Sequence, residues 1–252
     1  MRRVNVERVN PYDNDREKGK QVEEMFDSIA PAYDFMNTAM TFGLHRYWQN
    51  TAIKKALSSI GTGGAGDILD VATGTGDLVF YLHSKLPDAV ITGIDLSSGM
   101  LEIARKKLDK LSDYEKGLIS FNKGDCLSLP YPDSKFDLVT VAYGVRNFSQ
   151  LFQGLKEMGR VLKKNGVLCI IELSCPDGMI TAPCYKFYSG KLIPSIGKLV
   201  SGDSRAYSYL PESISACPQR DDMASLMKEA GFSDIKWKSL TFGAVAYYLG
   251  RK

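Results

Sequence analysis

Metal-ligating residues are scarce in this sequence, which has 2 histidines and 5 cysteines among its 252 residues. No two cysteines form a Cys-x-x-Cys pair and their number is odd, so neither a zinc site nor a disulfide framework is expected. We expect no metal ion, and reduced cysteines that pack in the interior. The cysteines are Cys126, Cys169, Cys175, Cys184 and Cys217.

Long apolar runs and a strong net charge are also lacking. No stretch of about 18 apolar residues occurs, which excludes a membrane-spanning helix. With 32 basic and 29 acidic residues, the formal net charge is only +3, which argues against a dedicated nucleic-acid-binding protein. Residues 1–20 are polar and lack the apolar core of a signal peptide, so a cytoplasmic location is expected.

From about Gly66 onwards, short apolar runs alternate with amphipathic helical runs. This alternation is typical of βαβ units around a parallel sheet, and it predicts a doubly wound α/β fold. The predicted strands are residues 67–72, 89–95, 119–125, 136–142 and 167–173, followed by two C-terminal strands near 235–240 and 244–249.

The intervening helices have recognisable ends. Apolar residues from Met100 to Leu111 recur at helical spacing, with Ser97 or Ser98 as the N-cap. A later helix over residues 151–162 is expected to stop at Asn165-Gly166, a left-handed cap pair.

Two segments fall outside the alternation. Residues 1–60 are rich in aromatics and predict a helical N-terminal lid segment, which leaves residues 61–252 as the main domain. An insertion near residues 175–218 follows the fifth strand and is rich in Tyr, Pro, Gly and Ser. Because it is too long for a plain connection, we expect it to be functional, as part of a substrate site.

A glycine-rich turn follows the first strand at residues 70–77, DVATGTGD. Glycines such as Gly74 and Gly76 let the backbone pass close to a ligand, with amide groups pointing at it. A dinucleotide site would want a third glycine where Val79 stands, and Asp77 would repel a pyrophosphate. The turn therefore favours a neutral or cationic ligand.

Acidic residues occur at three successive strand ends. Asp70 and Asp95 end the first and second strands, and Asp125-Cys126 ends the third. Such ends converge on one crevice at the carboxyl edge of a parallel sheet. S-adenosylmethionine fits this arrangement, because Asp95 can accept both ribose hydroxyls and Asp125-Cys126 can bind the adenine edge. Its amino group also favours nearby carboxylates.

Four separated tracts resemble the ubiquinone/menaquinone biosynthesis C-methyltransferases. They are residues 33–48 (YDFMN, then FGLHRYW), 143–147 (YGVRN), 207–214 (YSYLPESI) and 240–243 (LTFG). The resemblance covers the chain from about Gly19. It implies a Rossmann-like class I S-adenosylmethionine-dependent methyltransferase, with a seven-stranded mostly parallel sheet and an antiparallel C-terminal hairpin. It also implies methylation of a prenylated quinol, demethylmenaquinol to menaquinol.

The resemblance further implies roles for individual residues. The family's cofactor contacts fall on Thr75, Asp95, Asp125 and Cys126. Arg146 lies at the end of the fourth strand, beside the crevice, where it could stabilise negative charge on an ionising quinol. Asn147 could orient the same oxygen, and Tyr33 could donate to or relay from the hydroxyl. For Arg146-Asn147 a purely structural ion pair and helix cap stays an alternative.

Other functions fit the sequence less well. The Asn-Pro-Pro-aromatic signature of amino-methylating nucleic-acid enzymes is absent, and the one Pro-Cys pair, Pro183-Cys184, follows the wrong strand for a cytosine-C5 enzyme. A non-catalytic cofactor-binding partner in a quinone biosynthetic complex stays open, as does an enzyme acting on another small aromatic. The apolar substrate implies transient contact with a membrane surface, and homodimer formation is left open.

Overall fold

The computed structural model describes residues 4–12, 14–60, 64–178 and 204–252. Within these ranges, no helix is both long and apolar enough to pass through a bilayer. Part of the predicted insertion, including Pro183 and Cys184, lies outside the described residues.

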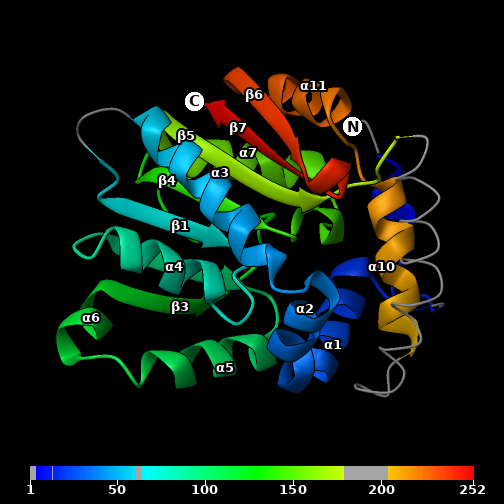
Figure 1. The fold of residues 1–252 in the computed structure, drawn as a ribbon, viewed down its shortest axis with the longest axis horizontal. Helices are drawn as coiled ribbons and strands as arrows, with labels where there is room; N and C mark the ends of the chain where they lie inside the picture. The colour runs from blue at the N-terminus through cyan, green and yellow to red at the C-terminus, as the bar shows by residue number, and fades with distance from the viewer. Residues whose placement is uncertain (1–3, 13, 61–63, 179–203) are drawn as a thin grey trace.

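A seven-stranded sheet forms the centre of the molecule, in the order β3-β2-β1-β4-β5-β7-β6 (Figure 1). The first five strands are parallel, and β7 pairs antiparallel with both β5 and β6. This confirms the predicted fold class. The strands are β1 (Asp67–Val71), β2 (Val90–Asp95), β3 (Ile119–Lys123), β4 (Phe136–Ala142), β5 (Leu162–Leu173), β6 (Ser233–Leu240) and β7 (Val245–Arg251).

Helices cover both faces of this sheet because its strands are apolar on both sides. In β1, Ile68 packs with α3 (Leu44–Ile60), α4 (Asp77–Lys85) and α5 (Ser98–Leu108), whereas Leu69 packs with α7 (Leu151–Val161) and α11 (Asp221–Glu229). Ser97 is the N-cap of α5, since its Oγ accepts the Met100 amide at 3.1 Å. The short α6 (Asp113–Leu118) precedes β3.

The predicted helix stop at Asn165-Gly166 is wrong. Helix α7 ends at Val161, and Leu162 already pairs with Phe136 in the sheet. Asn165 does adopt a left-handed φ of 66°, but inside β5, where its amide donates to the Lys252 carbonyl. The left-handed residue therefore bends a strand rather than capping a helix.

The carboxyl ends of the parallel strands are covered by segments from both ends of the sequence. On the right of Figure 1, α1 (Lys18–Ile29), α2 (Tyr33–Thr41) and α10 (Ser204–Ala216) stand beyond the strand ends. Met25, Met36, Met100 and Tyr209 pack together there. Helix α3 instead packs on the sheet face. The segments η1 (Asn5–Arg8) and η3 (Val145–Asn147) contact each other beside α10.

Candidate active site

Two cavities meet at the carboxyl edge of the sheet. The first, here the strand-end cavity, has a volume of about 780 Å³ including its open mouth and lies over β1, β2 and β4. The second, here the apolar cavity, has about 1410 Å³ and lies between α1, α2, α3 and α10. Both are lined by Phe26, Tyr33, Tyr143 and Asn147. These four side chains therefore form the boundary across which a group could pass.

The glycine turn is held in shape by hydrogen bonds from its own amides, to the turn itself and to Asp95 of β2. Gly74 and Gly76 have left-handed φ values of 56° and 80°. The Gly74 amide donates to Asp95 Oδ2 at 2.8 Å, and the Gly76 amide donates to the Thr73 carbonyl at 3.0 Å. Both amides thus have partners within the protein, Gly74 on Asp95 and Gly76 within the turn, while Gly74 lines the strand-end cavity. That the turn amides contact a ligand stays a prediction. Gly76 is not among the residues that line the strand-end cavity. Glycine is needed there because of the left-handed φ and because a Cβ would lie 2.8 Å from Phe121.

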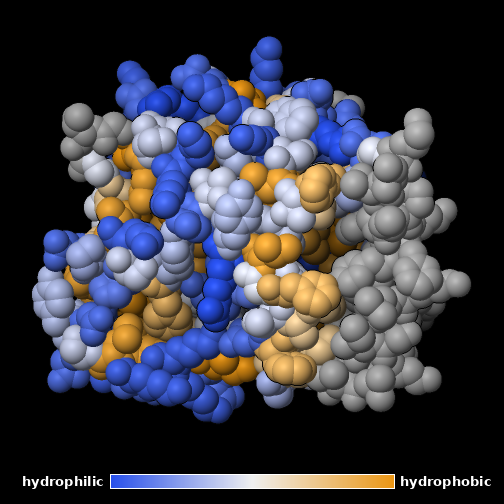
Figure 2. Space-filling model, in the orientation of Figure 1, coloured by the Kyte–Doolittle hydropathy of each residue, from blue (hydrophilic) through white to orange (hydrophobic). Residues whose placement is uncertain are grey.

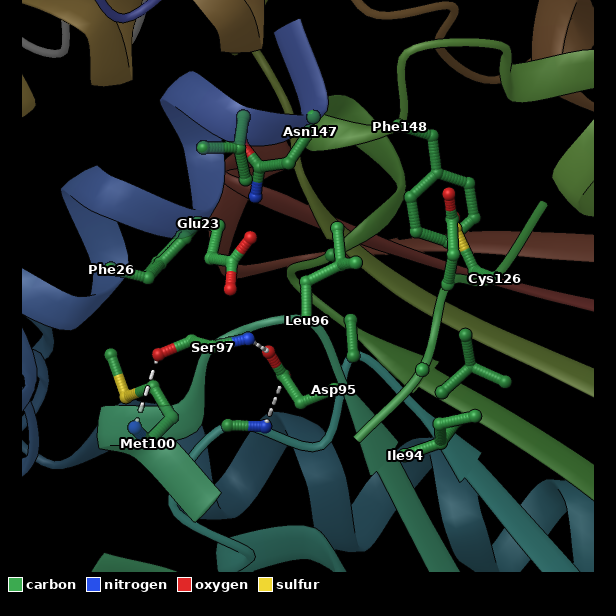
Figure 3. Close-up of a pocket in the computed structure, with 18 of the residues that line it drawn as sticks. Glu23, Phe26, Ile94, Asp95, Leu96, Ser97, Met100, Cys126, Asn147 and Phe148 are labelled. Atoms are coloured by element: carbon green, nitrogen blue, oxygen red, sulfur yellow. Dashed lines mark hydrogen bonds between the residues drawn. The ribbon is translucent and has the colours of Figure 1, made fainter. Parts of the chain in front are cut away.

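Asp95 lies on the wall of the strand-end cavity, as Figure 3 shows. Oδ1 accepts the Ser97 amide at 2.8 Å, while Oδ2 accepts Gly74. Burial raises the pKa of Asp95, and the backbone amides oppose that shift. Since each carboxylate oxygen has about two lone-pair sites, each keeps one acceptor site. A pair of ribose hydroxyls could use both.

The far end of the same cavity is lined by Asp125 and Cys126, which follow β3 in a loop. Asp125 Oδ1 accepts the Leu127 amide at 2.9 Å. The Cys126 side chain is buried, and burial raises its pKa well above the usual range. Its thiol is thus neutral and packs, which suits an adenine contact made through the backbone.

Asp70 and Thr75 line a smaller cavity that shares Gly74 and Tyr33 with the first. Asp70 is buried and accepts hydroxyl hydrogen bonds from Thr73 at 2.7 Å and Thr140 at 2.6 Å. Burial nevertheless raises the pKa of Asp70 to about 7. A carboxyl group with this pKa is poised to ionise when a cation arrives beside it.

Helix α2 is fastened to the glycine turn by charged and polar contacts. Thr75 donates to Asp34 Oδ1 at 2.6 Å. Lys107 bridges Asp34 at 2.7 Å and Asp77 at 2.6 Å. The charge on Asp77, expected from the sequence to repel phosphate, is therefore partly compensated. These contacts hold Tyr33, the first residue of α2, against both cavities.

Arg146 is buried at the wall of the apolar cavity and pairs with Glu172 at the end of β5. Its Nη1 donates to Glu172 Oε1 at 2.8 Å and also to the Tyr143 carbonyl. Arg146 Nε is buried and has no partner among the described residues. The ion pair weighed as an alternative is thus present, yet one guanidinium donor is still unused.

Asn147 and Tyr33 complete the predicted set at the boundary. Asn147 Oδ1 accepts from the Tyr209 hydroxyl of α10 at 3.1 Å, so the insertion reaches this point. Burial raises the pKa of Tyr33 to about 12, although the Arg146 charge opposes that shift. Tyr33 is consequently a neutral donor at physiological pH.

Tyr143 was quoted in a motif but not predicted as a site residue. It has a left-handed φ of 59°, and its buried hydroxyl has no partner within the described ranges. Burial raises its pKa well above the usual range. The periodicity of the sequence predicts neither the positive φ of Tyr143 nor its unpartnered hydroxyl. The only sequence signal for Tyr143 as a site residue is its position at the end of a strand. Glu23 of α1, which also lines the strand-end cavity, carries no sequence signal.

The strand-end cavity fits S-adenosylmethionine better than a phosphate-bearing cofactor. Asp95 and Asp125 present carboxylates on its walls, Asp70 lines the adjoining smaller cavity, and the turn amides are already used. Carboxylates accept from hydroxyl and amino groups and stabilise cations, but they repel phosphate.

Solved structures with the same fold define the class. An S-adenosylmethionine-dependent methyltransferase from Thermotoga maritima aligns with a TM-score of 0.61 at 19% identity, over 91% of this chain and 99% of that one. A phosphoethanolamine N-methyltransferase from Haemonchus contortus, solved with S-adenosyl-L-methionine, aligns with a TM-score of 0.58 at 14% identity, over 81% and 52%. The likeness to these structures shows the Rossmann-like fold of class I S-adenosylmethionine-dependent methyltransferases.

Sequence relatives narrow this class. The model of the ubiE/COQ5 methyltransferase family matches residues 14–252. Demethylmenaquinone methyltransferase of Bacteroides fragilis is 43% identical over 246 residues, 98% of each chain. A ubiquinone/menaquinone biosynthesis C-methyltransferase of Geotalea daltonii is 42% identical over 237 residues, 94% of this chain and 98% of that one. The chain therefore belongs to the ubiE/COQ5 methyltransferase family, which confirms the resemblance.

We expect the amino group of S-adenosylmethionine to lie beside Asp70. Because a cation lowers the raised pKa of this carboxyl group, cofactor affinity should increase as the pH rises through about 7. Asp70→Asn should abolish this pH dependence and weaken binding above about pH 7 by roughly tenfold. Calorimetric titrations at about pH 6 and pH 8 measure both effects.

Asp125→Asn is the matched control, since Asp125 lines the same strand-end cavity as Asp95 but is exposed. It should weaken cofactor binding by a similar factor at both pH values. A pH dependence that survives in Asp70→Asn would refute the placement of the amino group.

Proposed function

We propose that the chain transfers a methyl group from S-adenosylmethionine to a ring carbon of demethylmenaquinol, giving menaquinol. The observation that carries this proposal is the junction of the two cavities. The apolar cavity, of about 1410 Å³ including its open mouth, has room for a ring and part of a prenyl tail, and its polar groups lie where it meets the strand-end cavity. The names of the relatives support the same substrate.

Methylation at carbon needs an electron-rich ring. A quinol becomes nucleophilic when one hydroxyl loses its proton, and a preorganised donor stabilises the resulting negative charge. Arg146 lines the apolar cavity with a guanidinium that Glu172 holds through Nη1, and its buried Nε has no partner among the described residues. When bound, S-adenosylmethionine supplies the methyl group. The new bond to the ring carbon would replace the sulfonium–methyl bond and leave S-adenosylhomocysteine. The ring carbon then loses its proton to water, and the ring oxygen regains the proton that it lost.

The remaining boundary residues orient the ring in this proposal. Tyr33 and Tyr143 have raised pKa values, so they act as hydrogen-bond donors and not as bases. Asn147, fixed by Tyr209, can donate to the same ring oxygen through its amide. Holding ring and cofactor in line supplies a large part of the rate enhancement.

The proposed domain roles follow from this geometry. Within residues 1–60, α1 and α2 act as the lid, and α10 of the insertion closes the opposite side of the apolar cavity. Contact with a membrane surface belongs to the proposal because a prenylated quinol resides in lipid. Association of two chains stays a prediction, to be read from light scattering.

The reduced quinol, and not the quinone, should be the substrate. An oxidised ring is electron-poor and has no hydroxyl to ionise, so it cannot attack the methyl group. Anaerobic assays with the purified chain, with and without a reductant, followed by mass spectrometry of the product, test this. Equal turnover of the oxidised ring would contradict the mechanism, and no turnover of either ring would favour a non-catalytic or different aromatic role.

Removing the Arg146 donor should slow methyl transfer and leave cofactor affinity unchanged. Arg146→Met alone would strand the buried Glu172 carboxylate, which is strongly destabilising. We therefore pair it with Glu172→Gln. In this double variant the turnover rate should fall by roughly 10²–10³-fold, as when one oxyanion donor is lost. Single-turnover methyl transfer with saturating cofactor measures the rate.

Glu172→Gln alone is the control, because it keeps every guanidinium donor and an amide oxygen that can accept from Nη1. Since it also leaves the buried Arg146 charge unpaired, its Tm is measured first and its rate is taken below that Tm. Its rate should stay within about tenfold of the parent. Raising the pH should rescue the double variant more than the parent, since solution ionisation replaces the lost stabilisation. If the folded double variant binds cofactor and turns over at the parental rate, Arg146 serves only the ion pair.

A further inference from the structure

Two phenylalanines protrude from turns near the mouth of the apolar cavity. Phe42, which ends α2, is 81% exposed, and Phe242, in η5 (Thr241–Gly243) between β6 and β7, is 83% exposed. The two turns are neighbours of α3, since the Trp48 indole donates to the Thr241 hydroxyl at 2.7 Å. Trp48 and Thr241 also line the apolar cavity.

Both phenylalanines have an unfavourable backbone conformation. Their φ values are 50° and 56°, in the left-handed region that disfavours residues with a Cβ. Glycine or asparagine would suit these positions better, and the exposed rings gain little packing within the chain. A strained backbone conformation that brings no packing contact within the chain is typical of a residue that takes part in binding.

More apolar side chains surround these two rings. Leu44 and Tyr47, at the start of α3, are also exposed. Figure 2 shows apolar side chains gathered on this face over α2, the start of α3 and the turn between β6 and β7. We call Phe42, Leu44, Tyr47 and Phe242 the aromatic rim.

The two segments that carry the aromatic rim contain basic residues and no acidic residues. No acidic residue occurs from Phe35 to Gly66, which includes Arg46, Lys54 and Lys55. None occurs from Ile235 to Lys252 either, a segment with four basic residues. Arg46 and Lys238 are exposed, on α3 and β6. Exposed aromatics beside basic residues complement an anionic lipid surface.

We propose that the aromatic rim docks on the surface of an anionic lipid bilayer, with Phe42 and Phe242 inserted among the acyl chains. The mouth of the apolar cavity then faces the bilayer, so a prenyl tail can enter without crossing water. That last step rests on the proposed function, whereas lipid binding itself does not. A second copy of the chain fits less well, because a two-fold interface would bring these basic segments together.

The test uses the whole chain and phosphatidylcholine vesicles with or without phosphatidylglycerol. The parent should cosediment more with the anionic vesicles, and salt should weaken this binding. Phe242→Asn should lower the vesicle partition coefficient by about tenfold, because one inserted ring is lost. Phe42→Asn should act in the same direction. Tyr114→Asn is the matched control, an aromatic that is 66% exposed on α6 at the other end of the sheet.

The Tm of the variants distinguishes a role of Phe242 in lipid docking from a role in folding. Asparagine tolerates the left-handed conformation, so Phe242→Asn should keep or raise the Tm while vesicle binding falls. A lower Tm with unchanged vesicle binding would overturn the proposal, since Phe242 would then pack within the fold. Parental vesicle binding by both asparagine variants overturns it too, as does a parent dimer that Phe242→Asn dissociates without loss of vesicle binding.

Activity distinguishes this proposal from the proposed function. Phe242→Asn should turn over a short-tailed quinol in buffer at the parental rate but lose rate on a long-tailed quinol in vesicles. If the parent methylates neither quinol yet binds anionic vesicles, the proposed function fails and lipid docking stands. If Phe242→Asn matches the parent on both quinols and on vesicles, lipid docking fails alone.

Discussion

The buried ion pair between Arg146 and Glu172 holds together the part of the molecule where the two cavities meet. Glu172 accepts from the Arg146 side chain, from the Arg146 amide at 3.3 Å and from the Leu173 amide at 2.7 Å. Lys18 of α1 donates to the Arg146 carbonyl at 3.3 Å, and burial lowers the pKa of that lysine to about 8. The neighbouring Asn147 binds Tyr209 of α10. Lid, insertion and sheet thus converge on one short segment, η3.

A gain in the free energy of unfolding does not explain why this ion pair is buried. Removing two charges from water costs as much as their attraction returns, so apolar replacements are often equally stable. What the pair does provide is a guanidinium of fixed orientation with an unpartnered Nε beside an apolar cavity. In that surrounding a charge acts on a developing phenolate far more strongly than it would in water. The free energy spent on burying Arg146 and Glu172 thus serves the proposed stabilisation of the phenolate.

The sheet and most of the cofactor wall could be predicted from sequence because they follow from periodicity and strand ends. Asp70, Asp95 and Asp125 converge as parallel topology requires. What could not be predicted depends on tertiary contacts. Asn165 looks like a helix cap, yet β5 begins at Leu162 because the strand pairs with β4 and β7. Glu172, the partner of Arg146, is one acid in an apolar strand, and nothing local indicates its partner.

A crystal structure of the chain with S-adenosylhomocysteine and a short-tailed demethylmenaquinol tests the central claim most directly. The account predicts the quinol ring in the apolar cavity, between Tyr33 and Tyr143, with a ring oxygen hydrogen-bonded to the Arg146 guanidinium. The ring carbon should lie in line with the cofactor sulfur, leaving room for a methyl group at about 3–3.5 Å from the carbon. A ring bound elsewhere, or an Arg146 guanidinium that contacts only Glu172 and the Tyr143 carbonyl in the ternary complex, would contradict it.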